Sequence, residues 1–460
     1  MNVKKVHIYT IGCQMNVYDS EQIENLLRPI GYEKTEDLEA ADLIIVNTCA
    51  IRAKAEEKAF SFLGRVSRLK EKKSHLIVAI GGCVAQQEGE AVFKRAPCVD
   101  LVFGTRAIGK VPIHVMEIAK TGEKIIDIDM EILLEEGRYP VIDGYSGGTG
   151  ISKFVTIMRG CDNFCTYCVV PYVRGREMSR PPGSIMEEIT HLVSRGVKEV
   201  TLLGQNVNSY GAKEKLPSFP ELLCRVNEIA GLERIRFATS HPKDLSDDLI
   251  TAIASLDKVV KHIHLPVQSG SDLILKKMNR RYTRAIYLDK VDRLRRAVPG
   301  VEITTDLIVG FPGETEADFH ETLRLMETVL FDGVFAFKYS DRPNAPASAF
   351  FPKVSLEEKK ERLKAILDLQ EDITRNKHER EKGSIKEVLV EGPSKHAEKR
   401  LSGAEEAPAP IQWTGRTPGI TIVNFIENPD APPSGADLTG KKVRVRIEKA
   451  LAHSLWGIHV

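Results

Sequence analysis

Several features that would classify a protein at once are missing from this sequence. It has no uninterrupted apolar run near the roughly 18 residues that a helix needs to cross a bilayer, and its first residues lack the apolar segment of a signal peptide. Net charge is almost absent, because 65 Lys and Arg residues face 64 Asp and Glu residues, which leaves +1. We therefore expect a cytoplasmic protein without a membrane partner, in which any contact with nucleic acid depends on local basic patches.

Cysteine is present, but the most conspicuous cysteine stretch lacks a fourth thiol. Cys161, Cys165 and Cys168 lie together in Gly160–Cys168, and the other five of the eight cysteines are remote in sequence. In a long chain of a reducing compartment, cysteines favour metal binding or catalysis over disulfides. Structural zinc sites and ferredoxin clusters take four protein ligands, so three thiolates leave one metal position open to a ligand that is not protein. From this spacing alone, zinc and an iron–sulfur cluster are both possible.

Residues 1–120 alternate short apolar runs with stretches of helical periodicity. This βαβ pattern predicts an α/β domain built on a doubly wound parallel sheet. The expected strands are Val6–Thr10, Leu43–Thr48 and Leu76–Ile80, and the expected helices are Asp19–Leu27 and Ala53–Leu69.

Three further cysteines lie at the ends of these expected strands. Cys13 follows the first strand, Cys49 ends the second and Cys83 follows the third. Because ligands bind beyond the carboxyl ends of parallel strands, the three thiols would meet at one edge and form a second three-thiolate metal site. The alternative is that they are small buried hydrophobic residues, as free cysteines often are. We expect that packing role for Cys98 and Cys224, which have no partner at a ligand spacing.

A second strand–helix region spans residues 147–376, after a predicted acidic linker at 121–146. Its six βα units predict a partial (β/α)6 barrel, with chemistry at the C-terminal ends of the strands. The expected strands are Phe154–Met158, Glu199–Leu203, Ile235–Ala238, His262–Leu265, Glu302–Ile308 and Gly333–Phe337. The three-cysteine loop follows the first of them, and loops rich in glycine, amides and hydroxyls follow the next four. These loops predict a small-molecule pocket and contain Gly204, Gln205, Ser240, His241, Gln268 and Gly310.

Two groups of basic residues are candidates for contact with RNA. Lys276–Arg296 carries nine basic residues against two acidic ones, although a solvated helix face would look the same. Arg174, Arg176 and Arg180 follow the cysteine loop and are better placed to reach a polyanion near it.

Residues 377–460 change character and alternate like β-strands. The expected strands are Ile385–Val390, Ile420–Phe425 and Lys442–Ile447, with Gly and Pro turns between them. This pattern predicts a small β-barrel of a type that often binds RNA.

These motifs together resemble the radical S-adenosylmethionine methylthiotransferase family over nearly the whole chain. The three-cysteine loop, with an aromatic residue at Tyr167, is similar to the radical S-adenosylmethionine signature. Further stretches resemble the subgroup that adds a methylthio group to C2 of N(6)-dimethylallyladenosine next to the tRNA anticodon. These stretches are Gly12–Asn16, Asn47–Lys58 and Gly160–Arg180.

The resemblance implies two [4Fe–4S] clusters and S-adenosylmethionine as cofactors. Cys161, Cys165 and Cys168 would hold the cluster that chelates S-adenosylmethionine, and Cys13, Cys49 and Cys83 would hold an auxiliary cluster that presents sulfur. The expected cofactor-binding residues are Tyr167, Gly204, Gln205, Gln268 and Gly310. An electron from a donor such as flavodoxin or ferredoxin would cleave S-adenosylmethionine to a radical that removes the C2 hydrogen, and a second S-adenosylmethionine would supply the methyl group. The C-terminal module, called TRAM in this family, would bind tRNA, whose anticodon-loop bases can be splayed into a pocket.

Other functions fit the same motifs. A methylthiotransferase of this family could act on threonylcarbamoyl-adenosine in tRNA or on an aspartate of a ribosomal protein. A different class is an iron–sulfur or zinc protein that binds RNA without catalysis. The chain departs from the family pattern at Asp341, Asn344 and Ala345 and in the insertion Gly403–Pro410, none of which is an expected cluster ligand.

Overall fold

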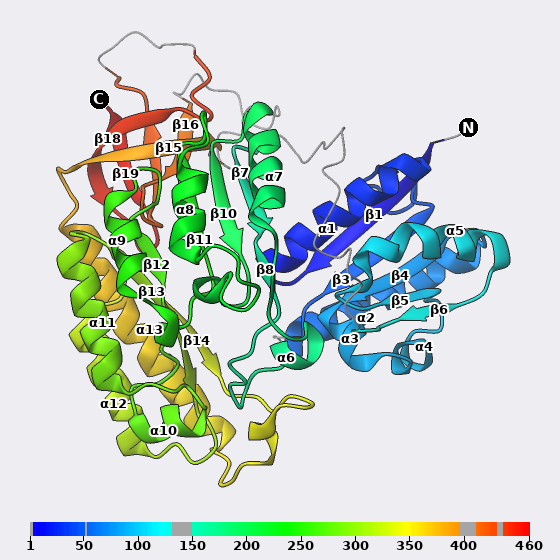
Figure 1. Ribbon diagram of the computed structural model, residues 1–460, viewed down its shortest axis with the longest axis horizontal. Helices are drawn as coiled ribbons and strands as arrows, with labels where there is room; N and C mark the ends of the chain where they lie inside the picture. The colour runs from blue at the N-terminus through cyan, green and yellow to red at the C-terminus, as the bar shows by residue number, and fades with distance from the viewer. Residues whose placement is uncertain (1–2, 51–52, 131–149, 395–410, 430–435) are drawn as a thin grey trace.

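The computed structural model describes residues 3–50, 53–130, 150–394, 411–429 and 436–460 (Figure 1). The N-terminal α/β domain lies beside a larger central domain, and the C-terminal barrel sits on the central domain away from the N-terminal one (Figure 1). The insertion Gly403–Pro410 lies outside the described residues. In the described part of the chain, no helix combines the length and apolar character needed to cross a bilayer.

The N-terminal domain is a six-stranded parallel sheet with helices on both faces, which confirms the doubly wound prediction. Its strands, in the spatial order β2-β1-β3-β4-β5-β6, are β1 (Lys4–Ile11), β2 (Tyr32–Lys34), β3 (Leu43–Thr48), β4 (Ile77–Gly82), β5 (Leu101–Phe103) and β6 (Ile125–Asp127). One face is covered by α1 (Gln14–Leu27) and α5 (Val111–Thr121), and the other by α2 (Ala53–Lys72), α3 (Cys83–Glu88) and α4 (Ala91–Arg95). Because both faces are covered, every residue of β3 and β4 is buried, as their unbroken apolar sequences require.

The expected linker at 121–146 begins inside this domain. Strand β6 pairs with β5 through Leu101↔Ile125 and Phe103↔Asp127, so the sheet continues past residue 120. The carboxylate of Asp127 lies 2.9 Å from Nε2 of His114, a residue of α5, and this contact accounts for an acidic residue within the sheet. Residues 131–149 lie outside the described part of the chain.

The central domain contains the six predicted parallel strands, with bounds shifted by two residues at most. They form two adjoining sheets, one of β7 (Ser152–Thr156), β10 (Glu199–Leu203) and β11 (Arg234–Phe237), the other of β12 (His262–His264), β13 (Glu302–Val309) and β14 (Gly333–Lys338). A bridge between Ile235 and Val259 joins the sheets, and among the described residues β7 and β14 do not pair. The domain is therefore an open six-stranded (β/α) barrel.

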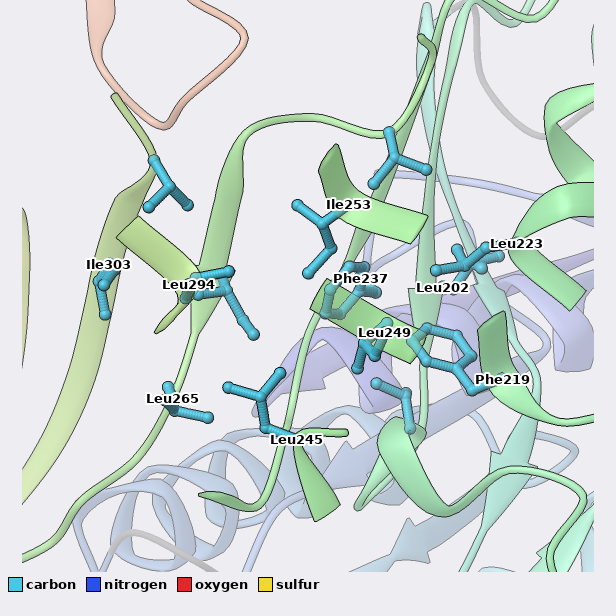
Figure 2. Close-up of a cluster of buried hydrophobic side chains, with 14 of the residues drawn as sticks. Leu202, Phe219, Leu223, Phe237, Leu245, Leu249, Ile253, Leu265, Leu294 and Ile303 are labelled. Atoms are coloured by element: carbon cyan, nitrogen blue, oxygen red, sulfur yellow. The ribbon is translucent and has the colours of Figure 1, made fainter. Parts of the chain in front are cut away.

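Helices pack around the outside of the barrel and cover the apolar side chains of its strands. They are α7 (Pro182–Ser194), α8 (Phe219–Asn227), α9 (Asp247–Ser255), α11 (Arg284–Ala297), α12 (Glu316–Val329) and α13 (Leu356–Glu379). Figure 2 shows Phe219 of α8 beside Phe237 of β11, with Leu249 of α9 close to them. The two aromatic rings are packed edge to face, and their centroids lie 5.2 Å apart. Each such side chain, fully buried, contributes about 1.5–3 kcal/mol to stability. This packing fixes the strand ends from which the candidate site is built.

The C-terminal residues form a closed five-stranded barrel in the order β15-β16-β17-β19-β18. The strands are β15 (Ile385–Pro393), β16 (Gln412–Arg416), β17 (Ile422–Ile426), β18 (Lys442–Ala450) and β19 (Leu455–His459). The prediction of a small β-barrel is confirmed, although the short strands β16 and β19 were not predicted.

Two buried arginines of β11 attach this barrel to the central domain. Arg234 donates from Nη1 to the carbonyl of Thr417 at 3.2 Å, and Arg236 donates to the carbonyls of Thr417 and Gly419 at 3.0 and 2.5 Å. Glu199 balances the charge of Arg236 at 2.8 Å. Since buried guanidinium groups are costly unless paired and hydrogen-bonded, these contacts hold the barrel in one position.

Candidate active site

The three-cysteine loop is held in place by the central barrel. It follows β8 (Met158–Arg159) and precedes the short helix α6 (Val170–Val173). The backbone N–H of Gly160 donates to Oε1 of Gln205 at 2.5 Å, and the backbone N–H of Thr166 donates to the carbonyl of Met278 at 3.1 Å. Gly160 has φ of +76°, and a Cβ there would lie 2.0 Å from the carbonyl oxygen of Arg176, so only glycine fits. These contacts hold the start and the middle of the loop against the central barrel.

Each sulfur of this loop accepts a hydrogen bond. Nδ2 of Asn163 lies 3.5 Å from Sγ of Cys161, the backbone N–H of Val170 lies 3.5 Å from Sγ of Cys168, and Nη1 of Arg280 lies 3.3 Å from Sγ of Cys165. Such bonds stabilise thiolates and tune the potential of an iron–sulfur cluster.

Arg280 is a site residue that the sequence did not reveal. Its side chain is 4% exposed and also donates to the carbonyl of Pro266 at 2.6 Å and to the hydroxyl of Tyr282 at 2.9 Å. In the sequence it is one of nine basic residues in Lys276–Arg296, and nothing in that pattern distinguishes it. A buried, permanently charged guanidinium thus lies against one of the three sulfur atoms of the loop.

The electrostatics of the loop fit a cationic metal cluster. Burial and then the neighbouring Cys165 raise the pKa of Cys168 to about 12, and burial raises the pKa of Cys161. Three soft sulfur atoms thus lie in a poorly solvated place where deprotonation needs positive charge. An iron–sulfur cluster supplies such charge and accepts thiolate ligands, so the donor set fits the expected group.

Cys13, Cys49 and Cys83 come together at one edge of the N-terminal sheet. They follow β1, β3 and β4, which are adjacent strands with Ile11 opposite Thr48 and Thr48 opposite Gly82. A hydrogen bond with the Cys49 side chain is the largest effect lowering the pKa of Cys13, which is about 6. Burial raises the pKa of Cys83, which is 3% exposed. The three cysteines follow the ends of adjacent strands, as the sequence predicted, and their shared metal site stays a prediction.

A buried pair of asparagines ties two of these cysteine loops together. Oδ1 of Asn16 accepts the backbone N–H of Cys13 at 3.3 Å, and its Nδ2 donates to Oδ1 of Asn47 at 3.0 Å. Asn47 in turn donates to the carbonyl of Asn16 at 2.9 Å and precedes Cys49 by two residues. These hydrogen bonds give a structural reason for the asparagine in each of the stretches Gly12–Asn16 and Asn47–Lys58.

The two cysteine sets face each other across the boundary between the domains. Cys83 packs in an apolar cluster with Val169, which directly follows Cys168, and with Val173 of α6, and α6 packs against α3 (Figure 1). On the other side, Cys13 packs against a cluster that includes Leu203 at the end of β10. The N-terminal set therefore lies at the C-terminal face of the central barrel.

A buried ion pair crosses this boundary. Arg174 of the central domain donates from Nη2 to Oδ2 of Asp19 at 2.9 Å, with the side chains 4% and 1% exposed. The charge of Arg174 adds to the hydrogen bond from Cys49 in lowering the pKa of Cys13, and it opposes the rise that burial causes in the pKa of Cys83. Arg180 is likewise buried and pairs with Glu188 at 2.7 Å. The expectation that Arg174 and Arg180 reach RNA is wrong, because folding commits both to contacts within the protein.

Several charges of the basic segment Lys276–Arg296 are balanced within the protein. Arg284 pairs with Glu321, Arg293 with Asp247 and Arg296 with Asp292. Lys290 donates to backbone carbonyls, among them that of Leu245. Lys276 and Arg281 are exposed, so a contact of this segment with phosphate stays a prediction.

The expected S-adenosylmethionine contacts lie on the rim of the barrel, and several have structural partners. Tyr167 accepts from Nη1 of Arg280 at 3.4 Å, and Gln205 anchors Gly160. A Cβ on Gly204 would lie 2.4 Å from Met158, and Gly310, with φ of +70°, donates its N–H to Glu314 at 2.6 Å. Gln268 has φ of +74°. Its backbone N–H donates to the carbonyl of Asp306, and its carbonyl accepts the N–H of Ile308, each at 2.9 Å. Their role in cofactor binding stays a prediction.

The remaining cysteines take separate places. Cys98 packs partly buried in the N-terminal core, as expected, but Cys224 is exposed, so the packing role expected for it is wrong. Within the described residues, no group of three or more cysteine, histidine or carboxylate side chains is placed so that it could hold a metal ion. The assignment of the six clustered cysteines as metal ligands therefore stays a prediction supported by their convergence.

Comparison with known proteins follows the same division of the chain. Residues 5–104 match a family described as "Uncharacterized protein family UPF0004", and residues 155–326 match the Radical SAM superfamily. The first match contains Cys13, Cys49 and Cys83, and the second contains the three-cysteine loop.

Among solved structures, the chain is similar to TsrM, a radical S-adenosylmethionine methyltransferase from Kitasatospora setae. The TM-score is 0.58 at 14% identity, over 75% of each chain, so this likeness supports the fold alone.

Curated relatives match over the full length. The chain is 53% identical to the tRNA-2-methylthio-N(6)-dimethylallyladenosine synthase of Desulfosudis oleivorans, over 100% of this chain and 97% of that protein. It is 50% identical to the protein of the same name from Geobacter metallireducens, over 99% of this chain and 98% of that protein. The chain therefore belongs to the tRNA-2-methylthio-N(6)-dimethylallyladenosine synthase family, a branch of the radical S-adenosylmethionine enzymes.

Proposed function

We propose that this chain adds a methylthio group to C2 of N(6)-dimethylallyladenosine next to the anticodon of tRNA. The observation that carries the proposal is the meeting of two three-cysteine sets, one from each α/β domain, at a boundary locked by Arg174 and Asp19. The names of the full-length relatives supply the substrate.

The two sets would divide the work. Cys161, Cys165 and Cys168 would hold one [4Fe–4S] cluster, and Cys13, Cys49 and Cys83 the other. With both bound, the site would supply reductive cleavage of S-adenosylmethionine and a sulfur atom for transfer to carbon. The residues Asn163, Val170 and Arg280 donate hydrogen bonds to the sulfur atoms of the first set, and Arg174 places a positive charge beside the second.

The barrel at the C-terminus would bind the RNA, with a flavodoxin or ferredoxin as the electron donor and the cytoplasm as the compartment. The fixed attachment of this barrel through Arg234 and Arg236 would hold the RNA at a constant distance from the cysteine sets. Unpaired bases of an anticodon loop are available for insertion into a protein site.

Turnover on defined RNA tests the proposal. Anaerobically reconstituted enzyme is incubated with S-adenosylmethionine, a reductant and anticodon stem–loops that carry dimethylallyladenosine, unmodified adenosine or threonylcarbamoyl-adenosine. We expect methylthiolation, read by mass spectrometry of the nucleosides, on the first RNA only. Modification of the threonylcarbamoyl RNA instead would show that threonylcarbamoyl-adenosine is the substrate. Cleavage of S-adenosylmethionine without any RNA product would contradict the proposal.

Nucleoside analysis in cells gives an independent check. A deletion strain should lack the 2-methylthio form of dimethylallyladenosine and accumulate the unthiolated nucleoside. An unchanged level of the methylthio nucleoside would contradict the proposed substrate.

A further inference from the structure

Two buried polar atoms at the end of β11 have no partner among the described residues. They are Oγ of Ser240 and Nε2 of His241, and each of the two residues is 5% exposed. A buried donor without an acceptor costs about 1–3 kcal/mol, so such atoms call for a ligand or another explanation.

The tautomer of His241 follows from its other nitrogen. The backbone N–H of Lys243 donates to Nδ1 of His241 at 3.2 Å, so the proton of the neutral ring lies on Nε2. Burial, followed by the positive charges of Arg280 and Lys243, lowers the pKa of His241 to about 2. His241 therefore presents a neutral N–H donor at physiological pH.

The position of this donor is fixed by the backbone. Thr239, just before it, has φ of +71°, which is strained for a β-branched residue. The carbonyl of Thr239 accepts the N–H of Val207 at 3.1 Å, and the N–H of His241 donates to Oδ1 of Asn206 at 3.1 Å. Hydrogen bonds between the loops after β10 and β11 thus hold the backbone before Ser240 and His241 in a strained conformation.

The pair lies near the three-cysteine loop, and the residue before its loop packs on the same cluster as Cys13. The ring of His241 meets Tyr282 edge to face at 5.7 Å, and Arg280, which bonds to Tyr282, also contacts Cys165. On the other side, Ala238 packs with Cys13 around the cluster at the end of β10. The ring of His241 therefore lies beside the residues that surround Cys165, and the loop that carries it begins at the cluster on which Cys13 packs.

We propose that Ser240 and His241 form the subsite that binds the adenine ring to be modified, with Nε2–H of His241 donating to a ring nitrogen of the base. The inference rests on the proposed function and adds the residues that recognise the base. A neutral donor suits an uncharged heteroaromatic acceptor better than a phosphate or a carboxylate, for which the cationic Lys243 and Lys290 lie nearby. The adenine of S-adenosylmethionine has the same chemistry, but the residues expected to bind that cofactor lie in the three-cysteine loop and after β10, β12 and β13 rather than after β11.

Matched substitutions distinguish loss of the Nε2–H donor of His241 from damage to the fold. In His241→Asn, the side chain can still accept from Lys243 but cannot reach the position of Nε2, whereas His241→Gln places an amide N–H near that position. Ser240→Ala removes the hydroxyl alone. The exposed His320 of α12 provides the control His320→Asn. Equal iron content and circular dichroism establish that each variant is folded.

The readout is the dissociation constant of the reconstituted enzyme for two stem–loops, one with dimethylallyladenosine and one with an abasic site at that position. We expect His241→Asn and Ser240→Ala to weaken binding of the first RNA about tenfold and to leave the abasic RNA unaffected, with His241→Gln recovering most of the loss. Equal weakening of both RNAs would overturn the proposal. So would weaker binding of S-adenosylmethionine in equilibrium dialysis with unchanged RNA binding, which would assign the subsite to the cofactor. Failure of the wild type to modify the first RNA would instead refute the proposed function.

Discussion

The ion pair between Asp19 and Arg174 should control how firmly the two cysteine sets are held together. Asp19 is 1% exposed and accepts from Arg174 at 2.9 Å and from Arg159 at 3.4 Å. Replacing it by Asn leaves two buried guanidinium groups without their carboxylate. Breaking a buried pair in this way costs about 3–5 kcal/mol, whereas an exposed pair contributes about 0–1 kcal/mol. We expect the lower end of the first range, because Asn keeps one acceptor oxygen.

Hydrogen exchange measures this cost without assuming that a chain of several domains unfolds in one step. In Asp19→Asn, backbone amides of α1 should exchange about 100-fold faster, since each 1.4 kcal/mol changes an equilibrium tenfold. The matched control is Asp368→Asn in α13, which breaks the exposed pair of Lys364 and Asp368, whose side chains are 77% and 59% exposed. Exchange around that pair should change less than about fivefold.

A double substitution separates the pair from its surroundings. Asp19→Leu combined with Arg174→Met should cost less than the sum of the two single changes, because it removes both charges together. If Asp19→Asn left the exchange of α1 as in the wild type, or if the two single effects were additive, the boundary would be held by apolar packing instead of charge.

Three further predictions concern single residues. Arg280→Gln removes a positive charge beside Cys165 and should lower the reduction potential of the radical cluster by about 50 mV in an electron paramagnetic resonance titration, whereas an unchanged potential would contradict its role at the thiolate. Because burial lowers the pKa of His241 to about 2, its contribution to stability is full above about pH 6.5 and falls by about 1.4 kcal/mol per pH unit below it. Thermal unfolding of the metal-free protein between pH 7 and 5 should therefore depend less on pH in His241→Gln, and equal slopes would show that the histidine is not kept neutral. Cys224→Ser should retain the full iron content and remove the thiol that iodoacetamide labels first, while loss of iron would make that exposed residue a ligand.

Much of the architecture was predictable because it depends on local patterns. The unbroken apolar runs of β3 and β4 require burial on both faces, and parallel strands bring Cys13, Cys49 and Cys83 to one edge without any knowledge of side-chain packing. Short strands were missed, since three residues such as those of β5 and β6 carry too little periodicity to stand out.

The charged residues were harder to interpret, because their partners are remote in sequence. Arg174 pairs with Asp19 from another domain, and Arg280 is buried against Cys165 while its neighbours in the same basic segment lie on the surface. A sequence shows the charge of such a residue but not the direction of its side chain. The same limit applies to Gln205, whose amide anchors the cysteine loop at Gly160, although its pattern suggested only a ligand contact.

If each cysteine set holds its own [4Fe–4S] cluster, the iron content of the protein should fall by half when either set is removed. Wild-type protein and two triple variants are reconstituted anaerobically, one with Cys13, Cys49 and Cys83 replaced by Ala and one with Cys161, Cys165 and Cys168 replaced. Iron and sulfide are counted together with Mössbauer spectra. We expect about eight irons per wild-type chain and about four in each variant. About four irons in the wild type, or a triple variant that keeps all eight, would contradict this expectation.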